Sequence, residues 1–169
     1  MTPVSVSFYV LSETKAQDIL GFVCSLTQTV IDKSALAVVI LSDDSAKLSQ
    51  IDDALWAFEA TSFIPHQVIN DRVTSKNSAA NTATNSKDLS PRVLLSKNLP
   101  NGFSGAVINL TAKALILNSE NNSENSNSQT SNPSRILELV LPNEQSTALG
   151  RQKYQAYKSQ GCKLQHFKV

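Results

Sequence analysis

The chain has 169 residues, with 15 Lys and Arg against 14 Asp and Glu, so its formal net charge at pH 7 is +1. A charge this small produces no overall field that would by itself attract nucleic acid or a membrane surface. Hydrophobic residues make up 41% and charged residues 17%, which predicts one domain over residues 1–169 with a polar but weakly charged surface.

The first half of the chain alternates between strand and helix. Residues 4–11 are β-branched and aromatic, as in a strand, and apolar positions over residues 19–31 then recur at helical spacing. Residues 35–41 form a continuous apolar run that is typical of a strand buried on both faces. Residues 42–44 (Ser-Asp-Asp) are good helix caps, and a second helix is expected to end near residue 58.

The second half supplies further strands and a last helix. The strand candidates are residues 93–96, 106–110 and 136–141. Pro142 and Asn143 begin a helix that runs to about residue 160, Gly161 ends it, and residues 162–169 alternate as a last strand. This order predicts the α/β class, as a three-layer Rossmann-like domain with a mainly parallel sheet and helices on both faces.

Two polar stretches interrupt this pattern, at about residues 74–91 and 119–134. The first is rich in Ser, Thr, Asn and Ala, and the second is almost wholly Asn, Ser, Thr, Gln and Glu. Neither can bury enough apolar surface to offset the entropy of ordering it. We interpret both as flexible surface insertions between core strands of the single domain.

The sequence also indicates a compartment. Residues 1–11 lack a basic segment followed by a long apolar stretch, and nowhere do about 18 apolar residues run together. We therefore expect a soluble cytoplasmic protein. Cys24 and Cys162 have no Cys or His at metal-ligand spacing beside them, which favours buried thiols over a zinc site or a disulfide framework.

No catalytic motif is visible at the expected strand ends. None of the five glycines forms a phosphate-binding loop, and neither His66 nor His166 belongs to a recognisable nucleophile motif. Asp43 and Asp44 follow the second strand, where a Mg²⁺-binding pair could lie, but helix capping explains the same residues. We expect no cofactor or metal; a nucleotide- or metal-dependent α/β enzyme that uses Asp43 and Asp44 is the alternative function.

Large apolar side chains gather where the second helix ends. Trp56 lies near the last residue of that helix, and Phe63 and Pro65 follow in an extended turn. These side chains belong either to the core or to an interface, where Trp and Phe dominate hot spots. Asp52 and Asp53 are expected on the solvent face of the same helix.

The last helix carries a basic and aromatic stripe. Arg151, Tyr154, Gln155 and Lys158 are three and four residues apart, so they share one helix face. Arg can hold a carboxylate while Tyr offers a flat apolar wall, which suits an acidic peptide that ends in a hydrophobic residue. The alternative is a solvated helix face whose Arg and Lys side chains only snorkel.

The segments DDALWAFEATSFIPH and RQKYQAYKSQGCKL resemble, in the same order, two signature segments of the DNA polymerase III chi subunit family, and the opening SFYVL strand also fits. The resemblance spans the chain apart from the two polar insertions. It implies an adaptor without catalytic function, which pairs with the psi subunit of the clamp loader. It also implies binding of the acidic C-terminal tail of single-stranded-DNA-binding protein.

The resemblance further implies roles for individual residues. The implied tail-binding positions are Leu141, Arg151, Tyr154 and Gln155, with Lys158 on the same stripe and Trp56 as a nearby candidate. Phe63, Pro65 and His66 are assigned either to the psi-facing side or to packing.

One position departs from the family. Where family members can carry a lysine, this chain has Gln155, and a lost cation should weaken carboxylate binding unless Lys153 or Lys158 compensates. Residues 151–169 contain five basic side chains and no Asp or Glu. Without an aromatic stacking platform this basic end should bind DNA only weakly, so neither direct specific nucleic-acid binding nor membrane binding is expected.

Overall fold

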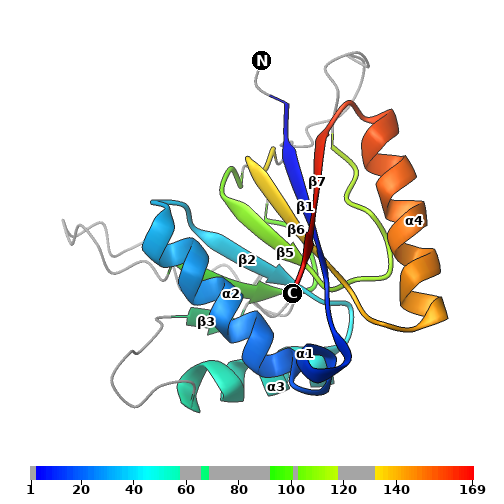
Figure 1. Ribbon diagram of the computed structural model, residues 1–169. Helices are drawn as coiled ribbons and strands as arrows, with labels where there is room; N and C mark the ends of the chain where they lie inside the picture. Colours follow the sequence, from blue (N-terminus) through cyan, green and yellow to red (C-terminus); the bar gives the residue numbers. More distant parts are fainter. Residues whose placement is uncertain (1–2, 58–65, 69–91, 101–102, 118–131) are drawn as a thin grey trace.

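The computed structural model describes residues 3–57, 66–68, 92–100, 103–117 and 132–169 (Figure 1). The strands in these ranges are β1 (Ser5–Val10), β2 (Val38–Leu41), β3 (His66–Val68), β4 (Val93–Ser96), β5 (Ala106–Asn109), β6 (Arg135–Val140) and β7 (Lys163–Lys168). The helices are α1 (Glu13–Gln17), α2 (Ile19–Lys33), α3 (Ser45–Ala57) and α4 (Glu144–Ser159).

The seven described strands form one sheet in the order β3-β4-β2-β5-β6-β1-β7, and each of their pairings is parallel. Helices α2 and α3 cover one face, and α4 covers the other (Figure 1). The predicted α/β class, with a Rossmann-like sheet between two helical layers, is confirmed. Among the described strands, β3 and β7 lie at the two opposite edges of the sheet.

The sheet divides the apolar core because successive strand residues point to opposite faces. In β2, Val38 and Ile40 pack under α2 and α3, whereas Val39 and Leu41 pack on the α4 side, and all four are at most 2% exposed. The prediction of a strand buried on both faces is therefore confirmed. The α4 side of the core is completed by Phe8 from β1 and Tyr157 from α4, which are also buried.

The structure confirms the first predicted helix and adds two short elements. Helix α2 covers the predicted residues, and the Asp18 side chain caps it by accepting a hydrogen bond from the Gly21 N–H at 3.1 Å, whereas the short helix α1 before it was not predicted. Strand β3 was not predicted, because three residues are too short for a periodic signal. Asp44 caps α3 by accepting from the Ala46 N–H at 2.9 Å, as expected of it.

The prediction that both Asp52 and Asp53 lie in solvent is wrong for Asp52. Its carboxylate is 2.7 Å from Nε2 of His66 on β3, and its side chain is 33% exposed, while Asp53 is exposed as predicted. The pairing requires β3 to lie beside α3, which periodicity along α3 does not reveal.

The polar insertions fall largely outside the described residues. Residues 74–91 lie entirely outside them, and of residues 119–134 only 132–134 are described. There the Ser134 N–H donates to the Gly105 carbonyl oxygen at 3.0 Å, and Pro133 is buried. These three residues therefore form the approach to β6.

Helix α4 ends as its sequence predicts. Gly161 has a φ of 78°, in the left-handed region that favours glycine. Its N–H donates to the Lys158 carbonyl at 3.1 Å, and the Cys162 N–H donates to the Tyr157 carbonyl at 3.1 Å. These two bonds make a Schellman cap, which turns the chain back into β7.

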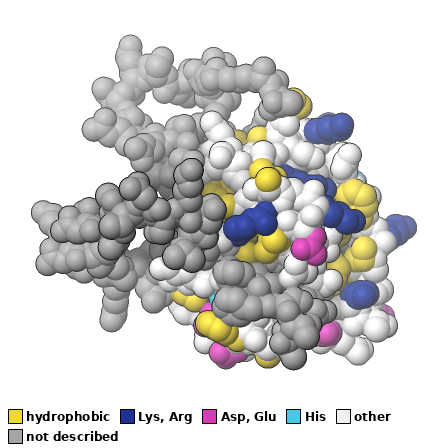
Figure 2. Space-filling view, turned by 90° about the vertical axis from the view of Figure 1, so that its left-hand side faces the viewer, with side chains coloured by type: hydrophobic (Ala, Val, Ile, Leu, Met, Phe, Trp, Pro, Cys, Tyr) yellow, Lys and Arg dark blue, Asp and Glu magenta, His cyan; other side chains and the backbone are white. Residues whose placement is uncertain are grey.

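On the face shown in Figure 2, charged side chains of both signs are scattered among larger uncharged areas, in keeping with the low charged fraction. Both cysteines are free; Cys24 is buried and Cys162 is half-buried. Burial raises the pKa of the Cys24 thiol to about 11, and the charge of Asp18 adds to this rise. Among the described residues, no helix is long and apolar enough to cross a membrane.

Candidate peptide-binding site

Helix α4 is positioned by its own capping residues. Asn143 accepts a hydrogen bond from the Ser146 N–H at 2.7 Å, and the Ser146 hydroxyl accepts one from the Leu141 N–H at 2.8 Å. Together these bonds fix the angle at which α4 leaves the end of β6. The helix then lies against the sheet with one face buried and another at the rim of a cavity.

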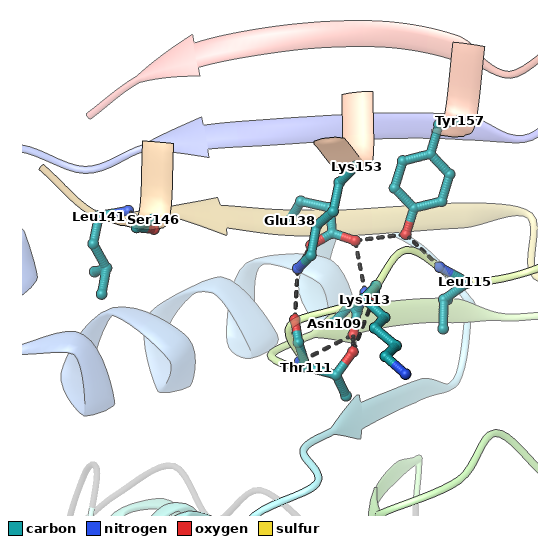
Figure 3. Close-up of polar contacts among 9 residues, drawn as sticks. All are labelled: Asn109, Thr111, Lys113, Leu115, Glu138, Leu141, Ser146, Lys153 and Tyr157. Atoms are coloured by element: carbon teal, nitrogen blue, oxygen red, sulfur yellow. Dashed lines mark hydrogen bonds and ion pairs between the residues drawn. The ribbon is translucent and has the colours of Figure 1, made fainter. Parts of the chain in front are cut away.

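A buried polar network holds the sheet-facing side of α4 (Figure 3). Glu138 on β6 is 0% exposed; its carboxylate pairs with Lys153 Nζ at 2.7 Å and accepts from the Tyr157 hydroxyl at 2.6 Å. Asn109, the neighbour of Glu138 on β5, donates to the same carboxylate at 2.7 Å. Lys153 also donates to the Thr111 carbonyl at 2.6 Å. Three side chains thus donate hydrogen bonds to the buried Glu138 carboxylate.

Burial sets the protonation of this network. Loss of hydration raises the pKa of Glu138 above its usual range, although the charge of Lys153 opposes this rise. Burial and the nearby Glu138 together raise the pKa of Tyr157. Lys153 is only 7% exposed and paired, so it is not available to replace the cation that is missing at Gln155.

A cavity of about 470 Å³ lies at the carboxyl ends of the parallel strands, where α/β proteins commonly bind ligands. Its lining includes Asp43, Lys47, Glu138, Leu141 and Lys153. We call it the strand-end cavity. The carboxylate of Glu138 is already occupied by the contacts of the buried network. Asp44, the other half of the predicted acidic pair, is not among its lining residues and instead caps α3.

A second cavity, of about 380 Å³, lies between α4 and strands β1, β6 and β7. Its volume is within the range of small ligand sites, which begin near 300 Å³. The lining residues are Phe8, Val10, Val140, Thr147, Gly150, Arg151, Tyr154, Gln155 and His166. We call it the α4 cavity. A Cβ on Gly150 would lie 3.0 Å from Val140 Cγ2, so the missing side chain lets α4 approach β6 closely there.

The α4 cavity joins aromatic surface to positive charge. The ring of Phe8 lies 6.0 Å from that of Tyr154, and Arg151 is exposed at the rim. Among the described residues its lining contains no Asp or Glu, and no described carboxylate lies within ion-pair distance of Arg151. The cavity can therefore take an apolar group that carries negative charge beside it.

The predicted stripe is brought together only in part. Arg151, Tyr154 and Gln155 line the α4 cavity, whereas Lys158 is exposed on α4 outside this lining. Leu141 lies at the end of β6 and lines the strand-end cavity instead. Trp56 lies on α3, across the sheet from α4, and is 61% exposed.

The residues proposed to face psi are only partly described. Phe63 and Pro65 lie outside the described residues. The His66 side chain is 0% exposed, pairs with Asp52 and lies edge-on to Trp56 with ring centres 5.3 Å apart.

Sequence reasoning missed the floor of the α4 cavity. Phe8, Val10 and Val140 belong to strands that were predicted. They lie under α4 only because β1 and β6 are neighbours in the sheet, and the sequence does not give the strand order. His166 was dismissed because it matched no catalytic motif. The alternation of residues 162–169 was the one signal that placed it on the same strand face as Leu164, which packs in the core beneath α4.

Two comparisons bear on this arrangement. A family model described as "DNA polymerase III chi subunit, HolC" matches residues 1–165. A curated relative from Pseudomonas aeruginosa, DNA polymerase III subunit chi, is 26% identical over 165 residues, which cover 97% of this chain and 96% of the relative. Both matches include α3, β6 and α4.

Proposed function

This chain belongs to the DNA polymerase III chi subunit family, a family of accessory polymerase subunits that places it in DNA replication, and from this premise we propose a specific adaptor role. The protein links the clamp loader, through the psi subunit, to the C-terminal tail of single-stranded-DNA-binding protein. It performs no chemistry of its own. Its work is to hold two partners at once.

The α4 cavity is the observation that carries the tail-binding half of this proposal. An acidic peptide that ends in an apolar residue can insert that side chain over Phe8 and beside Tyr154. Arg151 then pairs with a carboxylate of the same peptide, and no acid among the described lining residues opposes it. An aromatic wall beside a guanidinium group is suited to a peptide in which a hydrophobic residue lies next to a carboxylate.

The remaining residues of the stripe have lesser roles in this proposal. Gln155 offers an amide donor at the cavity, in place of a charge. Lys158 is exposed one helical turn beyond Tyr154 and attracts acidic residues farther along the peptide. Leu141 supports the entry to α4 beside the cavity, because its N–H is bound by Ser146.

The psi-facing half of the proposal concerns the other end of the sheet. Trp56 is a large exposed apolar group there, and it packs against His66 at the β3 edge. We assign Trp56 to psi rather than to the tail, and the buried His66 side chain supports the Trp56 ring. Phe63 and Pro65, which lie outside the described residues, are assigned to psi from the family resemblance alone. Exposed Trp is a frequent interface hot spot.

The test is a titration of the full chain with a peptide that has several acids followed by a C-terminal Phe. We expect a Kd in the micromolar range, and Arg151→Ala should weaken binding at least about tenfold, equal to about 1.4 kcal/mol. Lys33→Ala is the matched control, because Lys33 is an exposed cation on α2, across the sheet. No binding by the unmodified protein, or equal weakening by both variants, would contradict the proposal.

A further inference from the structure

His166 completes a group of three rings in the α4 cavity. It lies directly opposite Phe8 in the β1–β7 register, and the two rings stack with centres 5.3 Å apart and planes 19° apart. Tyr154 on α4 is also 5.3 Å from His166 and 6.0 Å from Phe8. Strand β1 at the start of the chain and the consecutive elements α4 and β7 at its end therefore contribute one aromatic surface.

We propose that His166 contacts the ligand and determines specificity in the α4 cavity. Its ring face packs against the terminal apolar side chain of the peptide, and a ring N–H donates to a peptide carboxylate. This inference rests on the proposed function, and it adds a residue and a pH dependence that neither the stripe nor the family match provides. The family match ends at residue 165.

The surroundings of His166 support a contact role over a structural one. His166 is exposed, lines the cavity, and has no hydrogen-bond partner among the described residues. Its β7 neighbour Phe167 points to the opposite sheet face, where it stacks on Tyr9 at 5.4 Å. Within the described part of the chain the His166 ring is held by stacking, and no described group occupies its ring nitrogens.

The charges that face His166 favour an anionic ligand. The cavity that His166 lines is also lined by Arg151, Tyr154 and Gln155 of α4. The described lining residues from β1 and β6 are Phe8, Val10 and Val140, which carry no charge. On its own strand, Lys168 lies on the same face by alternation and is exposed. No described carboxylate faces it.

Histidine changes its charge between about pH 5 and 8. A proton on the imidazole adds a second cation beside Arg151, so an acidic peptide should bind more tightly as pH falls through this range. The carboxylates of such a peptide stay ionised there, because free Asp and Glu titrate near pH 4. For a solvent-accessible ion pair the gain should be about two- to fivefold in Kd between pH 8 and pH 6.

The experiment measures Kd for the acidic peptide with a C-terminal Phe at pH 6 and pH 8, using the full chain. His166→Phe keeps the ring face but removes the N–H donor and the proton site, so it should bind somewhat more weakly than the unmodified protein at pH 8 and show no gain at pH 6. His166→Ala should weaken binding about threefold or more at both pH values, because one aromatic wall is lost. Gln165→Ala is the matched control on the other face of β7, with melting temperatures checked for every variant.

The outcomes separate this inference from the function on which it rests. Binding that depends on Arg151 but is equal in all His166 variants at both pH values overturns the role of His166 and leaves the tail site standing. A pH-dependent gain that survives in His166→Phe also overturns it, because the proton then binds elsewhere. No binding by the unmodified protein at either pH overturns both proposals.

Discussion

At the scale of single residues, the main surprise is Lys153. It belongs to the basic end of the chain and lies between Arg151 and Tyr154, yet it is buried against Glu138. An ion pair of this kind contributes little net stability against an apolar replacement of both partners, but removal of one partner leaves a buried charge. Lys153 therefore serves the packing of α4, and Arg151 is the cation at the α4 cavity.

Lys153→Met should reduce the free energy of unfolding at pH 8 by about 3 kcal/mol, because Glu138 loses its counter-charge in the interior. The loss should be smaller at pH 5. Burial already raises the pKa of Glu138, and without Lys153 that pKa rises further. A raised pKa in the folded state means that stability is fully present below the unfolded value and is lost as pH rises through the folded value.

Urea denaturation at the two pH values measures this effect. Arg151→Met is the control: it removes an exposed cation two residues away and should leave stability nearly unchanged. An equal loss in both variants, or a Lys153→Met loss that grows toward pH 5, would show that the Glu138 pair does not behave as a buried charge.

At the scale of elements, neighbouring parallel strands can pair only where their backbones approach closely. The apolar pattern of each strand does not predict where these approaches occur. The Ala106 N–H donates to the Ala37 carbonyl at 2.9 Å where β5 begins beside β2. Gly105 is buried directly before this bond, and a Cβ there would collide with the same carbonyl oxygen. Gly105 is thus required by the approach of two backbones, because its φ is not in the positive region.

Gly105→Ala should destabilise the protein by about 1–3 kcal/mol, since β5 must move away from β2 to make room. Thermal and urea unfolding measure the loss. Ala112→Gly is a useful contrast, because Ala112 is exposed on the segment after β5 and should change stability by less than Gly105→Ala. A neutral Gly105→Ala variant would mean that the start of β5 shifts freely, contrary to its full burial.

At the scale of the whole molecule, the sheet order separates two surfaces. The α4 cavity is built at β1 and the β7 edge, while Trp56 and His66 lie near the β3 edge. Partners at opposite edges of one rigid sheet do not compete for space, which suits the proposed bridge. The strand-end cavity lies between these two surfaces. Its buried acid, Glu138, is already bound by Lys153 and Tyr157 of α4.

The same placement predicts how the protein responds to small ligands. Mg²⁺ with or without ATP should leave its melting temperature unchanged, because Asp44 caps α3 and Glu138 is already paired. A ligand that binds the folded state selectively raises that temperature by mass action. A saturable rise that Asp43→Asn removes would favour the alternative, a metal- or nucleotide-dependent enzyme.

The sequence by itself determined the α/β class, most strand and helix positions, and the grouping of Arg151, Tyr154 and Gln155. Each follows from local rules, because burial on two sheet faces, helical spacing and the Gly161 cap are properties of neighbouring residues. The tertiary structure decided which side chains meet. Strand order brings His166 beside Phe8 and puts Trp56 at the far edge from α4, and the packing of α4 on the sheet pairs Lys153 with Glu138. Sequence spacing cannot report these contacts, since crossovers between parallel strands place distant segments side by side.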